Sequence, residues 1–137
     1  MCDVTRRGLL LSAAGLAGVS ASATQEAPVA GINKVDPLAT GVYFHQGDIE
    51  HQGHCNNGWI IFKDYVLVID ANFPSGAQNI LPKIRAITPK PIRFAFDTHH
   101  HGDHVYGNQV WVDNGATPVA HTGVIDEMKR LEPGAWE

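Results

Sequence analysis

The sequence predicts an α/β protein in which helices pack over a sheet. Short runs rich in β-branched and aromatic residues, "WIIFKDYVLVID" at 59–70 and "IRFAFDT" at 92–98, are typical of strands. Between and after them, residues 75–88 and 122–132 carry apolar side chains at helical spacing. The 137 residues, 44% hydrophobic and 18% charged, are enough for one packed domain. Strands that alternate with helices favour a sheet covered by helices.

Residues 1–23 have the layout of an export signal: paired arginines at Arg6 and Arg7, an apolar run at Gly8–Val19, and small residues up to Ala23. "TRRGLLL" resembles a twin-arginine signal, and the alternative is a general secretory signal that carries two arginines. The apolar run is too short, and too rich in Gly and Ser, for a stable membrane span. We expect a periplasmic or secreted protein with no stable membrane span after cleavage.

The remaining chain divides into a flexible polar lead-in at 24–36 and a partial domain at 37–137. Cys2 leaves with the signal, so Cys55 has no intramolecular disulfide partner, and it is either buried and inert or close to a site. The formal charge is -4, and no basic stripe with interleaved aromatic residues is present. Nucleic-acid binding is therefore not expected.

The first half of the domain is expected to be β-structure. "GVYFHQG" at 41–47 predicts a strand, and the turn-rich residues 47–58 predict a loop. Residues 59–70 predict two strands joined by a turn at Lys63 and Asp64.

A helix, a strand and further short elements follow. "SGAQNILPKIRAIT" at 75–88 predicts a helix with Ser75 as a candidate N-cap, and Pro82 predicts either a kink or a late start. Residues 107–115 fit a helix or a strand equally well. "TPVAH" predicts a strand, and the last helix begins with Thr122 as a candidate cap.

Four histidines and an aspartate lie within "THHHGDH" at 98–104, directly after a predicted strand. In extended chain, residues i and i+2 point the same way, so His99 and His101 can reach one ion while His100 faces elsewhere. Neutral imidazole is a common zinc ligand. Exposed histidines clustered by chance are the alternative, and the spaced pattern behind an apolar strand disfavours it.

The second part of the motif adds a carboxylate. Gly102 allows a sharp bend, after which Asp103 and His104 turn toward the same region or toward a second ion. Asp103 beside a metal-bound water would accept or orient its proton, which makes it the candidate catalytic residue.

The motif resembles the T-H-x-H-x-D-H signature of the metallo-β-lactamase superfamily, and its three consecutive histidines are similar to glyoxalase II-like members. The strand "YVLVID" ending in Asp70, the helix before the motif and "TPVAH" fit the same family, so the resemblance covers roughly residues 40–132. It implies a four-layer αββα sandwich with the site at one edge of the sheets.

The resemblance also implies a site and a reaction. His99 and His101 would bind a first metal, Asp103 and His104 a second, and Asp70 would support the ligands. The metal would be zinc, two ions in a complete homologue, with iron as an alternative. A zinc-activated hydroxide would hydrolyse an ester, thioester, lactone or amide bond of a small molecule.

The sequence departs from the family after His104. The family's third ligand histidine, bridging acid and final histidine have no counterpart: His121 is expected to have a polar role at a strand end, and Asp126 and Glu127 to lie on a solvated helix face. We therefore expect only the N-terminal half of the fold, truncated or completed by a partner chain that supplies the missing ligands.

Two other functions stay open. The chain could be a degenerate, non-catalytic member that binds metal incompletely, or a mononuclear iron oxygenase acting on sulfur substrates. In the loop at 47–58, His51 and His54 are expected to be ordinary loop residues, and a place at the substrate cleft is the alternative.

Overall fold

The computed structural model describes residues 31–131 and residue 134. The predicted export signal at 1–23 and residues 24–30 of the predicted lead-in lie outside the described residues. Within the described part of the chain, no helix is both long and apolar enough to cross a membrane.

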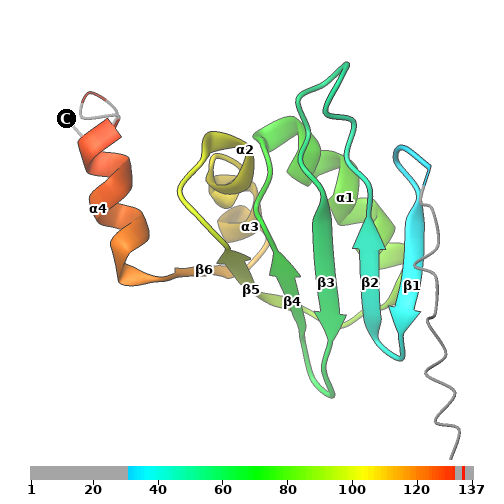
Figure 1. The fold of residues 1–137 in the computed structure, drawn as a ribbon. Helices are drawn as coiled ribbons and strands as arrows, with labels where there is room; N and C mark the ends of the chain where they lie inside the picture. The colour runs from blue at the N-terminus through cyan, green and yellow to red at the C-terminus, as the bar shows by residue number, and fades with distance from the viewer. Residues whose placement is uncertain (1–30, 132–133, 135–137) are drawn as a thin grey trace, which may run out of the picture.

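Residues 31–131 form a six-stranded sheet in which the strands follow one another in chain order (Figure 1). The pairs from β1 to β4 are antiparallel, whereas β4–β5 and β5–β6 are parallel. The strands are β1 (Val35–Ala39), β2 (Val42–His45), β3 (Asn57–Ile61), β4 (Val66–Ile69), β5 (Ile92–Asp97) and β6 (Thr117–Ala120).

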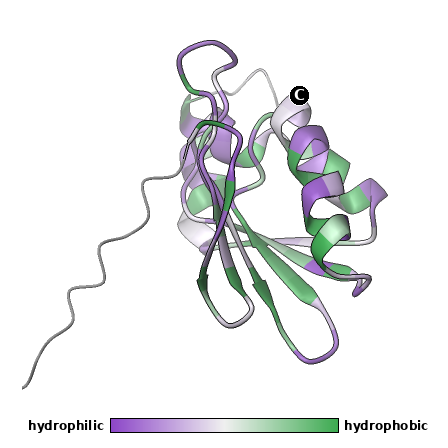
Figure 2. Ribbon diagram, turned by 90° about the vertical axis from the view of Figure 1, so that its right-hand side faces the viewer, coloured by the Kyte–Doolittle hydropathy of each residue, from purple (hydrophilic) through white to green (hydrophobic). Residues whose placement is uncertain are grey.

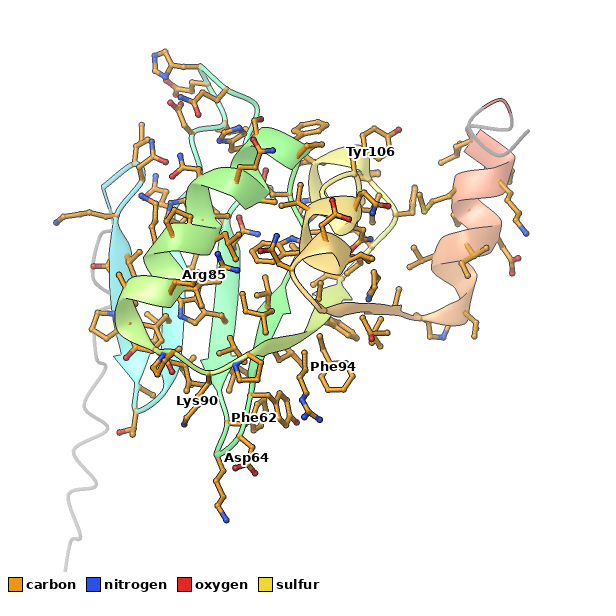
Figure 3. All side chains as sticks on the ribbon, turned by 180° about the vertical axis from the view of Figure 1, so that it is seen from behind. Phe62, Asp64, Arg85, Lys90, Phe94 and Tyr106 are labelled. Carbon is orange, nitrogen blue, oxygen red and sulfur yellow. The ribbon has the colours of Figure 1, made fainter. Side chains whose placement is uncertain are left out.

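The helices of the described residues are α1 (Pro74–Ile87), α2 (Gly102–Val105), α3 (Asn108–Asp113) and α4 (Thr122–Leu131). Figure 3 views the sheet from the face that α1 and α3 cover, and Figure 1 views the opposite face. Helix α4 stands apart from the other helices, beyond the edge strand β6 (Figure 1). Val124 is its one buried residue among those described.

The hydrophobic core lies between the sheet and the layer formed by α1 and α3. Trp59, Val68 and Ala95 are opposite one another on neighbouring strands, and all three side chains are fully buried. Tyr43 stacks on Trp59 with ring centroids 5.6 Å apart. The predicted hairpin is confirmed, with Ile61 opposite Val66 next to its turn.

The sheet begins earlier than the sequence indicated. Val35 and Asp36, assigned to the flexible lead-in at 24–36, belong to β1, where Val35 lies opposite His45. The strand is short, carries Pro37 and is at the edge of the sheet, the position where proline is tolerated. Pro37 and the shortness of the strand concealed it.

Helix α1 corrects two expectations. Phe73 occupies the N-cap position and Pro74 the first turn, so Ser75 is not the cap. The helix neither starts late nor ends at Pro82. Pro82 lies on the exposed side of α1, where water can bind the carbonyl oxygen that the proline leaves without a donor.

The later elements resolve the remaining ambiguities. Residues 107–115 contain helix α3, and its Trp111 is fully buried. The strand predicted from "TPVAH" is β6. At the start of α4, His121 Nδ1 accepts a hydrogen bond from the Gly123 N–H at 3.1 Å, so His121 takes the capping role predicted for Thr122.

The second face of the sheet is apolar and has no helix from α1 or α3 on it. Figure 2 shows hydrophobic residues along the strands. The register places Leu67 beside Phe94, and Ile69 beside Phe96, on this face, and Phe96 and Val119 are exposed. The described residues thus form one helix layer and one sheet, two of the four layers that the family resemblance implies.

The packing of α1 makes a matched prediction. Ile84 is 1% exposed and Ile87 is 38% exposed on the same helix. We expect Ile84→Ala to lower the free energy of unfolding by about 2–5 kcal/mol, because it leaves a cavity. Ile87→Ala should cost less than about 1 kcal/mol. Urea denaturation of both variants checks this, and equal losses would contradict the packing described for α1.

His45 is an unusual core residue. It is 1% exposed, and neither ring nitrogen has a hydrogen-bond partner among the described residues. Burial lowers the pKa of His45 to about 4, with smaller contributions from the charges of Lys83 and His54. The folded protein therefore holds this imidazole neutral at every pH above that value.

Stability should follow the titration of His45. The unfolded chain takes up the proton near pH 6.5, whereas the folded chain takes it up near pH 4. Stability is therefore complete above pH 6.5 and is lost as the pH falls to 4, by up to about 3 kcal/mol. In urea titrations between pH 6.5 and pH 4, we expect the stability difference between wild type and His45→Gln to change by up to about 3 kcal/mol.

The raised pKa of Asp97 has the opposite effect on stability, but it is present in both proteins and cancels in their difference. Gln52→Ala, at an exposed position without a titratable side chain, serves as the control and should give a curve parallel to that of the wild type. Parallel curves for His45→Gln as well would contradict the lowered pKa.

Candidate metal site

The predicted site lies at the edge of the sheet where β4 and β5 end. Asp70 directly follows β4, and the motif at 98–104 directly follows β5. Because the two strands are parallel neighbours, their carboxyl ends meet at one edge, where α/β proteins place ligands. Gly102 begins α2 as the predicted bend, and a Cβ there would lie 2.6 Å from the Tyr106 ring.

A buried amide pair fixes the chain after β4. Asn72 Nδ2 donates to Asn57 Oδ1 at 2.6 Å and to the Cys55 carbonyl at 3.0 Å. Asn57 Nδ2 donates in turn to the Asp70 carbonyl at 2.5 Å. Asp70 and Asn72 both have positive φ angles, 65° and 63°, which Asp and Asn tolerate better than most residues do.

Main-chain bonds tie the motif to this segment. The Ala71 N–H donates to the His104 carbonyl at 2.7 Å, and the Gly107 N–H donates to the Asn72 carbonyl at 2.6 Å. Trp111 Nε1 donates to the Ala71 carbonyl at 3.0 Å from the buried side. These bonds join the end of β4 to the helical turn α2.

The Asp70 carboxylate connects the strand end to the motif. Its Oδ1 accepts hydrogen bonds from the Thr98 N–H at 2.9 Å and from the Thr98 hydroxyl at 2.8 Å. Its Oδ2 lies 3.0 Å from His104 Nδ1. The other ring nitrogen of His104, Nε2, lies 3.4 Å from Asp103 Oδ2. The His104 ring therefore lies between the two carboxylates, and its Nδ1 contact with Asp70 lacks hydrogen-bond geometry.

The predicted ligand histidines lie close together. The ring centroid of His99 is 4.6 Å from that of His101 and 4.0 Å from that of His104. The ring of His100 is 6.2 Å from that of His99 and 4.7 Å from that of His101. Burial, followed by the neighbouring His104 and His101, lowers the pKa of His99, which favours the neutral imidazole that binds metals.

The side chains of the motif are of the types that bind zinc, but their donor atoms do not converge on one position. Over residues 31–131 and 134, no group of three or more His, Cys, Asp or Glu side chains is arranged so that it could hold a metal ion. His99, His101, Asp103 and His104 therefore stay the predicted ligands. Binding an ion would require the half-buried His99 and the exposed His101 to turn toward His104.

A cavity of about 410 Å³ borders Asp70, Asp103 and His104, and the loop between β2 and β3 forms its other side. Cys55 and His54 line it, whereas His51 is exposed and binds Asp48. Burial raises the pKa of Cys55 to about 12, with smaller contributions from Asp70 and Asp103. The thiol is therefore both buried and close to the site, two roles that the sequence offered as alternatives.

The late polar residues lie elsewhere. His121 begins α4, Asp126 is exposed, and Glu127 forms an ion pair with Arg130. None of the three lines the 410 Å³ cavity. The Asn57–Asn72 pair is the site feature that the sequence did not assign, since "HCNNG" read alone is typical of a turn.

Known proteins with related sequence or structure were compared with the chain. The family model described as the metallo-beta-lactamase superfamily matches residues 52–136. No curated protein matches the chain. Among solved structures, a metallo-beta-lactamase from Hirschia baltica is similar with a TM-score of 0.60 and 23% identity, over 74% of this chain and 47% of that one.

Two further solved structures agree. A metallo-beta-lactamase from Pontibacter korlensis has a TM-score of 0.62 at 16% identity, over 72% of this chain and 47% of its own. FIM-1, a metallo-beta-lactamase from Pseudomonas aeruginosa in a mono-zinc form, has a TM-score of 0.58 at 22% identity. The match covers 74% of this chain and 45% of its own.

The chain thus spans about half the length of the solved structures that it matches, which confirms the predicted partial α/β fold. The family model independently covers more than half of this chain. The chain belongs to the metallo-β-lactamase superfamily.

Proposed function

We propose that the protein is a zinc-dependent hydrolase of an ester, thioester, lactone or amide bond in a small molecule. Superfamily membership suggests a metal-dependent hydrolase. The observation that carries the proposal is the contact between Asp70 Oδ2 and His104 Nδ1 at 3.0 Å. A carboxylate on one ring nitrogen, with the other nitrogen left for an ion, is the usual environment of a metal-binding histidine.

His99, His101, Asp103 and His104 would hold the metal. A bound zinc ion would supply an activated water and polarise the bond that is cut. Asp103 Oδ2, 3.4 Å from His104 Nε2, would orient that water and hold its proton. Thr98 keeps Asp70 in place through two hydrogen bonds, so Asp70 can act on His104 rather than turn toward the ion.

The cavity beside Asp103 and His104 would receive the substrate. Its volume of about 410 Å³ is in the range of small-molecule sites. Ile49, Cys55 and His54 line the part away from the motif. Because the pKa of Cys55 is raised to about 12, the thiol there is neutral and adds no charge to the cavity.

Zinc is the metal that we propose, and a similar solved structure carries a mono-zinc description. Metal analysis distinguishes three possible contents of the site. These are one zinc ion, two zinc ions, or a single iron ion in an oxygenase that acts on sulfur substrates. We also propose that the protein acts after export to the periplasm, on the basis of residues 1–23 of the sequence alone.

A second candidate is a non-catalytic member that binds metal incompletely. The lack of a converging group of three ligands within the described residues favours it. In that case a partner chain would have to supply the remaining ligands before hydrolysis could occur. Metal content separates this candidate from the hydrolase.

The ligand assignment makes a prediction for zinc content. We expect the purified chain to retain zinc after dialysis, and His101→Ala to lose most of it, since a ligand is removed. His100→Ala, on the neighbouring residue that is not assigned as a ligand, should retain the wild-type amount. Mass spectrometry of the metal measures both. Equal retention by the two variants would contradict the assignment.

The supporting role of Asp70 predicts a second effect. Asp70→Asn should weaken zinc binding by about 10–100-fold, because His104 loses the carboxylate that orients it. Competition with a chromogenic chelator gives the affinity, and circular dichroism checks the fold. Asp113→Asn, which removes an exposed carboxylate on α3, should leave the affinity unchanged. An unchanged affinity in Asp70→Asn would show that the contact with His104 has no role in binding.

A further inference from the structure

The face of the sheet opposite α1 and α3 carries two rows of mostly apolar residues, and Figure 1 views this face. The strand register defines both rows. The first crosses β2 to β6 as Val42, Ile60, Leu67, Phe94 and Thr117. The second lies nearer the histidine motif and crosses the same strands as Phe44, Gly58, Ile69, Phe96 and Val119. These two rows form the open face.

The open face contains no charged residue. Asp36, on edge strand β1, lies at its margin, opposite Phe44. Parallel strands such as β4, β5 and β6 are almost always covered on both faces of their sheet. Among the described residues, α1 and α3 cover only the other face. The open face therefore calls for a second apolar layer.

The size of the open face is that of an interaction surface. Phe96 and Val119 are 38% and 40% exposed, and the apolar residues on β2, β3 and β4 are half-buried. Partly exposed side chains of these types leave roughly 500 Å² of apolar surface, which is at the upper end of what a monomer normally exposes. Two such faces packed together would bury about 1,000 Å², the area at which a contact becomes specific.

Gly58 indicates that another molecule approaches the open face. It is the second residue of β3, and its φ angle is not positive. A Cβ at Gly58 would meet its nearest neighbour, the Tyr43 carbonyl oxygen, at 3.5 Å, which is an ordinary contact. The chain itself therefore has room for a side chain there, and glycine weakens a strand. Glycines of this kind often mark the close approach of a partner.

We propose that a second copy of this chain packs on the open face, about a two-fold axis parallel to β4. This axis places β5 of one copy over β3 of the other, and β6 over β2, while each row stays level with its counterpart. The exposed Phe96 ring then fills the depression at Gly58 of the partner subunit. Val119 packs against Phe44 of the partner subunit, and no like charges meet.

The same properties favour a second copy over an unrelated partner. A partner for this surface must be flat, apolar and uncharged, with a depression where Phe96 projects. The open face itself meets all of these requirements, and a two-fold contact uses the same surface on both copies. Two sheets packed in this way lie about 10 Å apart with interdigitated side chains. The contact uses none of the predicted metal ligands, so it does not rest on the proposed function.

Sedimentation velocity of the full chain tests the proposal. Between about 1 and 200 μM we expect a monomer–dimer equilibrium, with a Kd of about 1–100 μM for an interface of this size. Gly58→Phe fills the depression and Phe96→Gly removes the ring that occupies it. Each change should raise the Kd at least about tenfold. The double exchange of both residues should restore dimerisation, because the ring and the depression change places.

A charged variant and a matched control locate the interface. Val119→Glu places a carboxylate on the open face at an exposed edge strand, where the monomer tolerates it, and should abolish the dimer. Ile87→Glu introduces the same charge at a residue that is as exposed as Phe96 but lies on α1, and should leave the Kd unchanged. Circular dichroism confirms that each variant is folded.

Three results would overturn the proposal. The first is a monomer at every concentration, which would mean that another part of the chain or a different protein covers the open face. The second is a dimer that Val119→Glu leaves unchanged. The third is a double exchange that dimerises no better than the single variants. Zinc content is measured separately, so this proposal and the metal assignment can fail independently.

Discussion

The hydrogen bond between the buried amides of Asn57 and Asn72 is the contact on which the site depends. It joins the start of β3 to the segment after β4, and through Asn57 it reaches the Asp70 carbonyl. Asp70 and Asn72 both adopt left-handed backbone conformations, which cost free energy and persist only where the surroundings impose them. The amide pair, with the Ala71 and Gly107 main-chain bonds, imposes them and so directs Asp70 toward His104.

The residues at the end of β5 make contacts on two sides of the sheet edge. Asp97, the last residue of β5, accepts a hydrogen bond from Asn108 of α3, whereas Thr98 turns back to Asp70. The motif then continues over the cavity that His104 and Asp103 border. Two consecutive residues at the end of one strand thus contact the helix layer on one side and the site on the other.

Sequence patterns predicted the elements with strong local signals and missed those fixed by distant contacts. The hairpin of β3 and β4, helix α1 and the strand before the motif follow from periodicity and residue type. Edge strand β1 was missed because it is short, contains Pro37 and pairs on one side only, so its sequence has no distinctive pattern. Ser75 suits an N-cap, but its hydroxyl pairs with His54, 21 residues away. The motif identified the metal donors, yet the direction of each imidazole depends on Asp70 and on tertiary contacts that spacing does not encode.

The order of the strands also affects how this part of the molecule folds. From β1 to β6, each strand pairs with the next one in the chain, and no later strand inserts between earlier ones. Loop closure is therefore short at every step, except where α1 or the residues of α2 and α3 connect parallel neighbours. The antiparallel strands can therefore pair early, whereas the parallel pairs need a helical crossover first and form more slowly. The sheet can grow strand by strand from the amino-terminal hairpin as the polypeptide leaves the ribosome, so that the histidine motif emerges onto a scaffold already formed.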